Sequence, residues 1–277
     1  MTDHERLRVE RLLGDRVRAR LPGPLAEFVM FGLKMAWACL FAGLMLVAII
    51  VTALFWPETA AFARYDFLVV YAIAAQALML LFRLESRSEA WVILLFHVSG
   101  TAMEIFKLRM GSWDYPEPGL LKLGGVPLFS GFMYASVGSF MARAMRLFDM
   151  TFTRYPPFWT TVLLAAAIYV NFFSHHFLPD ARWLLIVATI ALFWWVRVGF
   201  SPFGHRLWMP LVLAAFLSSL FLYLAENIGT LTGTWLYNGQ HGRGFTSPVK
   251  ITSWYLLLYV SFVQVSLVMR DRLKRGR

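Results

Sequence analysis

Cysteine is almost absent from this chain of 277 residues. Its single copy, Cys39, lies inside an apolar run, and one thiol cannot close a disulfide within the chain. The zinc sites that are built mainly on cysteine, such as Cys₄ and Cys₂His₂, need two or more such residues as well. A disulfide-stapled domain and a cysteine-based metal centre are therefore both excluded.

Charged residues are also scarce. They make up 15% of the sequence, against 59% hydrophobic and 17% aromatic residues, and the mean hydropathy is +0.60. Soluble domains carry about 25% charged residues, so this composition does not suit an aqueous surface. No hydrophilic stretch is long enough to form a soluble domain of its own. The sequence indicates a single membrane domain whose solvent is lipid.

The motifs of several well-known protein classes are missing from the sequence. There is no GxxxxGK[ST] loop for nucleotide phosphates, no HExxH zinc motif and no GxSxG nucleophile turn. The paired aspartate-rich motifs with which prenyltransferases hold diphosphate are absent, and so is the regular arginine series of a voltage sensor. These absences argue against each of those classes, and we expect no cofactor.

Eight apolar segments are present. Each is close to or above the ~20 residues with which an α-helix crosses a bilayer. The sequence therefore predicts an all-α membrane protein with about eight transmembrane helices. The segments are 28–56, 65–84, 89–108, 125–148, 158–177, 181–200, 207–229 and 249–269.

The net charge of +10 is explained by where the basic residues lie. Many of them fall in an N-terminal arm, residues 1–27, and in a short tail, residues 271–277. Basic residues beside membrane segments contact anionic lipid and set helix orientation, so we expect membrane lipid as a partner and no nucleic acid. Lysine and arginine are more frequent in alternate connections, on the side that holds both termini. This asymmetry predicts that both termini are cytoplasmic.

Two stretches of the chain carry the same motif. Seven residues after Glu104 comes Gly-Ser-Trp-Asp-Tyr, 111–115, and seven residues after Glu226 comes Gly-Thr-Trp-Leu-Tyr, 233–237. Each block leads through a glycine-rich loop to a proline that starts the next helix, and a tyrosine follows that proline by seven residues. These residues are Pro127 with Tyr134 and Pro248 with Tyr255.

This duplication predicts two four-helix repeats, residues 28–148 and residues 149–270. An even number of helices in each half gives both halves the same orientation in the membrane. The repeats should therefore be parallel, related by a pseudo-twofold axis along the membrane normal.

The two glutamates of the repeat are the candidate catalytic residues. A charge in hydrocarbon costs ~2.5–3.5 kcal/mol on insertion scales, so ionisable side chains within spans usually face a cavity. Glu104 and Glu226 lie about one helical turn before the outer ends of their helices. A buried carboxylic acid in that position is suited to general acid catalysis. A structural interpretation stays open, in which each carboxylate accepts hydrogen bonds from the loop that follows it.

Residues around the two glutamates are the candidate substrate contacts. His97 lies two helical turns from Glu104 on the same face. The tryptophan and tyrosine of each loop combine an apolar body with one polar edge, although an interfacial aromatic belt would use them too. The candidates are His97, Trp113, Tyr115, Asn171, Trp235 and Tyr237.

Two adjacent histidines with a nearby aspartate, His175, His176 and Asp180, raise the question of a metal site. Neighbouring residues on a helix point about 100° apart, which does not favour two ligands to one ion. The alternative is an ordinary interfacial helix end, and we expect no metal there.

The chain resembles a known family. Four stretches carry the likeness: His97-x-x-Gly-Thr-x-x-Glu104, the loop that begins Gly111-Ser-Trp, the helix start Gly125-Val-Pro-Leu-Phe, and Asn171-Phe-Phe-x-His-His. They are similar to the YoaT-like bacterial membrane family of unknown function, over most of the chain. The resemblance implies a protein of the bacterial inner membrane.

The segment from Glu104 to Tyr134 also resembles the membrane carotenoid hydratases, relatives of the small-subunit lycopene cyclases. Those proteins perform redox-neutral acid–base chemistry on polyene ends. The resemblance implies that Glu104 protonates a double bond. This chain has Trp113 where that loop usually has a small residue or phenylalanine.

Three functions are compatible with these observations. The first is a redox-neutral enzyme that acts on a small hydrophobic substrate, a lipid or an isoprenoid, from the outer leaflet. The second is a proton-coupled transporter of a small or cationic solute, because parallel repeats and paired intramembrane carboxylates suit transport too. The third is a metal-dependent intramembrane hydrolase built on His97, His175, His176, Glu104 and Asp180. The substrate and the oligomeric state stay open.

Overall fold

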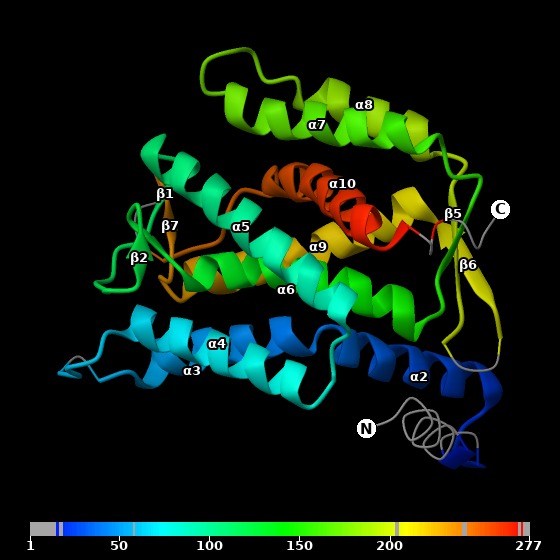
Figure 1. The fold of residues 1–277 in the computed structure, drawn as a ribbon, viewed down its shortest axis with the longest axis horizontal. Helices are drawn as coiled ribbons and strands as arrows, with labels where there is room; N and C mark the ends of the chain where they lie inside the picture. Colours follow the sequence, from blue (N-terminus) through cyan, green and yellow to red (C-terminus); the bar gives the residue numbers. More distant parts are fainter. Residues whose placement is uncertain are drawn as a thin grey trace.

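The structure is a computed structural model that describes residues 15, 16, 19–57, 59–202, 205–239, 243–270 and 273. Much of the predicted basic arm and most of the basic tail lie outside the described residues. Helices dominate, and short strands lie at both ends of the bundle (Figure 1). The helices are α2 Gly23–Ala38, α3 Leu40–Phe55, α4 Arg64–Leu81, α5 Arg87–Arg109, α6 Phe129–Leu147, α7 Phe158–Ser174, α8 Arg182–Phe193, α9 Leu211–Leu231 and α10 Lys250–Val268. The strands are β1 Trp113–Asp114, β2 Lys122–Leu123, β3 Val126–Pro127, β4 Thr151–Thr153, β5 Arg197–Phe200, β6 Leu207–Pro210 and β7 Leu236–Tyr237.

The apolar helices indicate a membrane protein. Among the described helices, α4, α5, α9 and α10 are long and apolar enough to cross a bilayer. The pair α2 and α3 would add a fifth span, broken by a bend of 69°, and α7 and α8 are apolar but shorter. Each of the eight predicted segments contains at least one helix. That the chain crosses the membrane eight times stays a prediction.

Large apolar side chains cover the outward faces of the bundle. Leu81 on α4 is 73% exposed, Leu184 on α8 is 71% exposed and Phe221 on α9 is 73% exposed. Soluble proteins rarely present apolar surface on this scale to water. Lipid is the medium in which these faces are stable.

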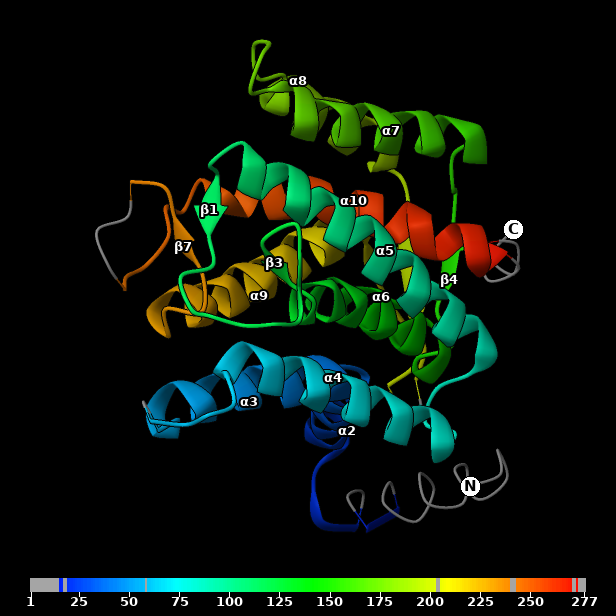
Figure 2. The same ribbon diagram turned by 60° about the vertical axis from the view of Figure 1, so that its left-hand side comes forward.

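The helix α6 lies inside the bundle, in contact with α2, α3, α4, α5 and α10 (Figures 1 and 2). Small residues let α5 approach it closely. A Cβ atom on Gly138 would lie 2.8 Å from the Val92 side chain, and one on Gly100 would lie 2.6 Å from that of Tyr134. This close approach sets Tyr134 against α5.

A three-stranded antiparallel sheet, β4–β5–β6, corrects two predicted helices. The helix expected over 181–200 ends at Phe193, and the segment expected to be helical over 207–229 begins as β6. In β5 the buried side chains of Val198 and Phe200 alternate with less buried ones. This period of two is that of a strand, and apolar content alone does not distinguish it from a helix.

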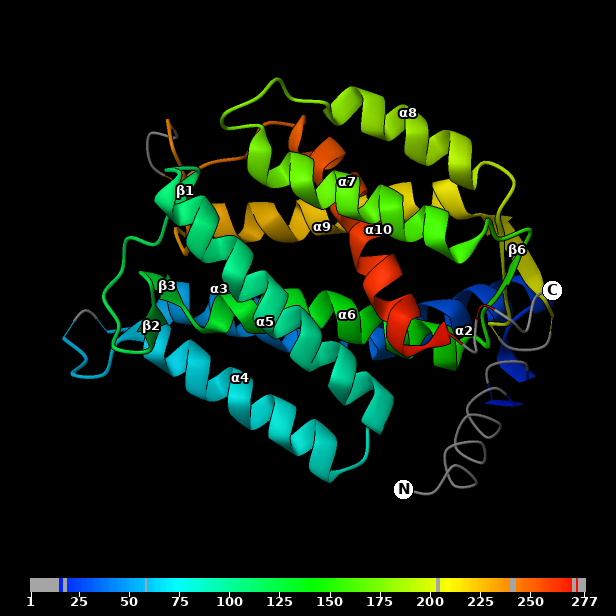
Figure 3. The ribbon, with the colours of Figure 1, turned by 45° about the horizontal axis from the view of Figure 1, so that its top comes forward.

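The strands β1 and β7 pair at the end of the bundle where α5 and α9 finish, and the β4–β5–β6 sheet lies at the opposite end (Figure 1). The pair α7 and α8 stands on one side of the bundle, and α3 with α4 on the other (Figure 3). Both repeated motifs are therefore at one end of the protein.

Candidate functional site

Glu104 lies in the last turns of α5 and is 4% exposed. Three side chains donate hydrogen bonds to its carboxylate. Trp113 Nε1 and Tyr115 OH donate to Oε2, at 2.7 Å and 2.8 Å, and Tyr134 OH donates to Oε1 at 2.7 Å. Both carboxylate oxygens are therefore occupied, by two donors from the following loop and one from α6.

Glu226 occupies the corresponding place on α9 and is 7% exposed. Trp235 Nε1 and Tyr237 OH donate to its Oε1, each at 2.7 Å. Within the described part of the chain both donors meet this one oxygen. No donor in the described ranges reaches its second oxygen, Oε2, and Glu226 is among the residues that line the adjoining cavity.

Tyr134 and Tyr255 hold matching places in the two sequence motifs but make different contacts. Tyr134 donates to Glu104, whereas the Tyr255 hydroxyl lies 3.2 Å from that of Tyr259. The two carboxylates therefore have unequal surroundings, with Glu104 more fully bonded than Glu226.

The register of β1 and β7 joins the two motifs. Trp113, the first residue of one Trp-x-Tyr sequence, is opposite Tyr237, the last residue of the other. The two middle residues, Asp114 and Leu236, are paired directly. A local twofold axis through this middle pair would produce that register.

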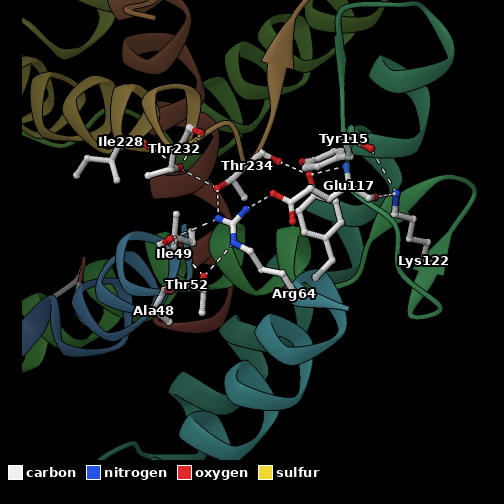
Figure 4. Close-up of polar contacts among 12 residues, drawn as sticks. Ala48, Ile49, Thr52, Arg64, Tyr115, Glu117, Lys122, Ile228, Thr232 and Thr234 are labelled. Atoms are coloured by element: carbon white, nitrogen blue, oxygen red, sulfur yellow. Dashed lines mark hydrogen bonds and ion pairs between the residues drawn. The ribbon is translucent and has the colours of Figure 1, made fainter. Parts of the chain in front are cut away.

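Arg64, at the start of α4, holds both loops (Figure 4). Its guanidinium forms an ion pair with Glu117 of the first loop and donates to Thr234 Oγ1 of the second at 2.8 Å. Its Nε donates to Thr52 Oγ1 on α3 at 3.0 Å. Tyr65 OH donates to the carbonyl oxygen of Thr234 at 2.7 Å. This buried network fixes the loops that supply the tryptophan and tyrosine donors.

A cavity of about 220 Å³ adjoins both glutamates. Side chains from α3, α7, α9 and α10 form its apolar walls, among them Met45, Ile168, Leu222 and Leu257. The paired carboxylates and their aromatic donors form a polar wall. A site of this size can hold a short hydrocarbon segment or a small head group, with most of a lipid chain outside it.

Three cations also line the cavity: Lys107, Arg182 and Lys250. Lys107 is 2% exposed, and its Nζ lies 3.3 Å from His175 Nε2 and 3.0 Å from His176 Nε2. It also lies 4.0 Å from the centre of a phenylalanine ring. The cavity therefore combines buried positive and negative side chains.

His175 and His176 are held in position by Lys107 and by a backbone carbonyl group. His175 Nδ1 lies 3.0 Å from the carbonyl oxygen of Asn171, and the two histidine rings are 4.3 Å apart. Burial, followed by the charge of Lys107, lowers the pKa of His176, so its neutral ring can accept from that ammonium. Across the described ranges, no group of three His, Cys, Asp or Glu residues is placed to hold a metal ion.

Asn171 and Asp180 stabilise the turn between α7 and α8. Asn171 Nδ2 donates to Asp180 Oδ1 at 3.0 Å, and Asn171 Oδ1 accepts from the Ala181 backbone at 2.9 Å. Asn171 also borders the cavity, whereas Asp180 pairs with Arg182 at 3.1 Å. The aspartate therefore acts on the site through the cation that it positions.

His97 lies away from the other predicted residues. The centre of its ring lies 4.5 Å from that of Phe132, with the rings tilted by 52°, and it is not among the residues that line the cavity. Two turns of helix displace it along α5 from Glu104, and α6 covers this part of the helix. A shared helical face therefore does not bring the two residues to one site.

The hydroxyl groups of the two loop tyrosines, Tyr115 and Tyr237, stay protonated and act as hydrogen-bond donors. Burial, and then the nearby glutamate charges, raise the pKa of Tyr115 and of Tyr237 well above the usual value. Both hydroxyls keep their protons at neutral pH. Because a phenolic hydroxyl both donates and accepts, each can bond a glutamate in either of its protonation states.

A family model described as "Protein of unknown function (DUF817)" matches residues 27–262. The chain belongs to the DUF817 family. It is also 42% identical over 247 residues to the uncharacterized protein YoaT of Bacillus subtilis (strain 168), a match that covers 87% of this chain and 91% of that relative. The predicted YoaT-like resemblance is thereby confirmed. No solved structure matches, and the resemblance to carotenoid hydratases stays a prediction.

Four residues of this DUF817 site are absent from the sequence-based candidates: Tyr134, Lys107, Arg182 and Lys250. The tyrosine repeats in the second half, which could have marked it, although its partner Tyr255 does not reach a glutamate. The cations lie at helix ends, where lysine and arginine usually extend toward the membrane surface. Their convergence on a cavity depends on the tertiary structure.

Proposed function

We propose that this DUF817 protein is a redox-neutral acid–base enzyme that acts within the membrane on a lipid or isoprenoid. One observation carries the proposal: two buried carboxylates share one wall of a cavity whose other walls are largely apolar. An apolar cavity suits a hydrocarbon substrate, and buried carboxylic acids are suited to proton transfer.

The proposal includes an arrangement in the membrane. The chain forms two parallel four-helix repeats that together cross the bacterial inner membrane eight times. Both termini are cytoplasmic, and the site opens toward the outer leaflet. The matching tryptophan and tyrosine contacts of Glu104 and Glu226, together with the β1–β7 register, support the repeats.

In this proposal Glu226 exchanges a proton with the substrate. Glu226 lines the cavity and its Oε1 is held by two donors, so the acid is fixed in place, and in the described ranges no donor occupies its Oε2. The protonated carboxyl group gives its proton to a carbon–carbon double bond. Water then adds to the resulting cation and returns a proton to the carboxylate. No oxidant or reductant is needed, because the proton lost in the first step is regained in the second.

Glu104 has a different part in the same reaction. Its three donors occupy both oxygens, so we assign the proton transfer to Glu226 and not to Glu104. When ionised, Glu104 places a negative charge at the cavity wall, and that charge stabilises positive charge that develops on the substrate. The faces of Trp113 and Trp235 can add cation–π attraction. The proposal thus gives Glu104 an electrostatic part, whereas the resemblance to carotenoid hydratases implies that it is the acid.

The test uses Glu226→Gln, which keeps the side-chain shape and one oxygen acceptor but removes the transferable proton. We expect native mass spectrometry of this variant, purified in mild detergent, to show a bound amphiphile. Wild-type protein should carry the same molecule plus one water, its isomer, or neither. The enzyme proposal fails if both proteins lack bound amphiphile and wild-type vesicles show solute-dependent proton uptake that Glu226→Gln abolishes. That result would identify a proton-coupled transporter.

A further inference from the structure

The cavity holds two lysine ammonium groups that carry no ion pair. In the part of the chain that the structure describes, neither Lys107 nor Lys250 pairs with a carboxylate, although Lys107 is almost fully buried. The Lys107 ammonium contacts two histidine nitrogens, and the Lys250 ammonium lies 3.6 Å from the centre of the Tyr237 ring. Glu226 attracts Lys250 and Asp180 attracts Lys107, but neither carboxylate lies within ion-pair distance of its lysine. A buried charge without a directly paired counter-ion is costly, so proteins that retain one usually have a use for it.

Arg182 joins these lysines at the cavity wall. The three cations come from α5, α8 and α10, and they lie close enough to act on one another electrostatically. Like charges that converge from separate helices repel one another, and a bound anion would relieve that repulsion. Arg182 is itself oriented by Asp180 at 3.1 Å and by Thr252 Oγ1 at 3.4 Å. These two contacts use two of its five N–H donors, so others are left for a ligand.

We infer that Lys107, Arg182 and Lys250 form a binding site for the anionic head group, phosphate or carboxylate, of an amphiphile. The cations bind the head group, and the apolar walls at Met45, Leu222 and neighbouring residues receive the adjoining hydrocarbon. This inference deepens the proposed function, and rests on it only in treating the bound molecule as the substrate.

The position of Lys250 adds a constraint on the substrate. Its ammonium lies over the ring of Tyr237, whose hydroxyl donates to Glu226. A head group bound by Lys250 is therefore separated from the reactive carboxylate by the Tyr237 side chain alone. We expect the bond on which Glu226 acts to lie close to the charged end of the amphiphile, and a neutral polyene without a head group to be a poor substrate.

The test measures binding of dodecyl phosphate to the full chain in a maltoside detergent, by native mass spectrometry and by the shift in melting temperature. Dodecyl maltoside and inorganic phosphate are the comparison ligands. We expect dodecyl phosphate to bind, and Lys107→Met or Lys250→Met to weaken its binding roughly tenfold or more, since each removes a charge-assisted hydrogen bond. Arg109→Gln is the matched control, because Arg109 lies on the same helix as Lys107 but is exposed and outside the cavity.

Three outcomes would overturn the inference. Equal binding by wild type and both lysine variants would show that the alkyl chain alone binds. Equal binding of inorganic phosphate and dodecyl phosphate would show an ion site without an amphiphile. A loss of stability in Lys107→Met and Lys250→Met without any loss of binding would show that the lysines only balance the two glutamates. All of these can be observed whether or not the protein catalyses a reaction, so they are distinct from a failure of the proposed function.

Discussion

Tyr134→Phe is the most informative single change to the hydrogen bonds of Glu104. It removes the hydroxyl that donates to Oε1 at 2.7 Å and leaves the two donors to Oε2 in place. The ring stays, so packing against α5 changes little. A hydrogen bond to a charged group is worth about 1.5–3 kcal/mol, and we expect a loss of stability in that range.

Tyr255→Phe is the matched control for this change. Tyr255 occupies the corresponding place in the second motif, but its hydroxyl contacts another phenol at 3.2 Å. A neutral hydrogen bond contributes about 0.5–1.5 kcal/mol, so the control should lose less. Both variants are unfolded by titration with a denaturing detergent, alone and in a Glu104→Gln background. The interpretation is refuted if Tyr134→Phe costs no more than Tyr255→Phe, or if it costs the same when Glu104 carries no charge.

Two further predictions concern the same site. Glu226→Gln should fold with near wild-type thermal stability, because its one amide oxygen can accept from both donors, whereas Glu104→Gln should be less stable, because its donors reach both carboxylate oxygens. Glu226→Gln should abolish turnover and Glu104→Gln should lower it without abolishing it; equal residual activity in both would contradict the separate roles. Gly229→Ala should destabilise the protein by about 1–3 kcal/mol, since its Cβ would lie 1.9 Å from the ring of Trp235 and displace the indole that donates to Glu226. Gly43→Ala is the control, as no atom lies within 4 Å of the added methyl group, and it should be neutral or stabilising by up to ~1 kcal/mol; similar losses in both variants would disprove the packing argument.

The lengths of the apolar runs predicted where the helices lie, because a helix surrounded by lipid must be apolar over a continuous stretch of sequence. It could not predict that the segment after Phe193 is a strand. There the backbone pairs with β4 and β6, which lie elsewhere in the sequence. The residue pattern within 194–200 does not reveal which other segments will pair with it, so the strand could not be predicted from that pattern alone.

The paired glutamates were predictable because each motif stands whole in the sequence, with its tryptophan and tyrosine at fixed spacing. The difference in their hydrogen bonding, three donors to Glu104 and two to Glu226, was not predictable. It depends on whether the tyrosine of the following helix reaches the carboxylate, and the close packing of α5 on α6 at Gly100 allows this for Tyr134. Lys107 was hidden for a similar reason, since a lysine at the end of a span is usually solvated.

Deuterium incorporation tests the proposed chemistry most directly. The amphiphile released from Glu226→Gln protein would be incubated with wild-type protein in lipid nanodiscs in deuterated water, and the product analysed by mass spectrometry. Proton transfer from Glu226 to carbon predicts a product that carries one deuterium on carbon, formed at a rate that Glu226→Gln abolishes. A product without carbon-bound deuterium, or the same product with the variant, would contradict the account.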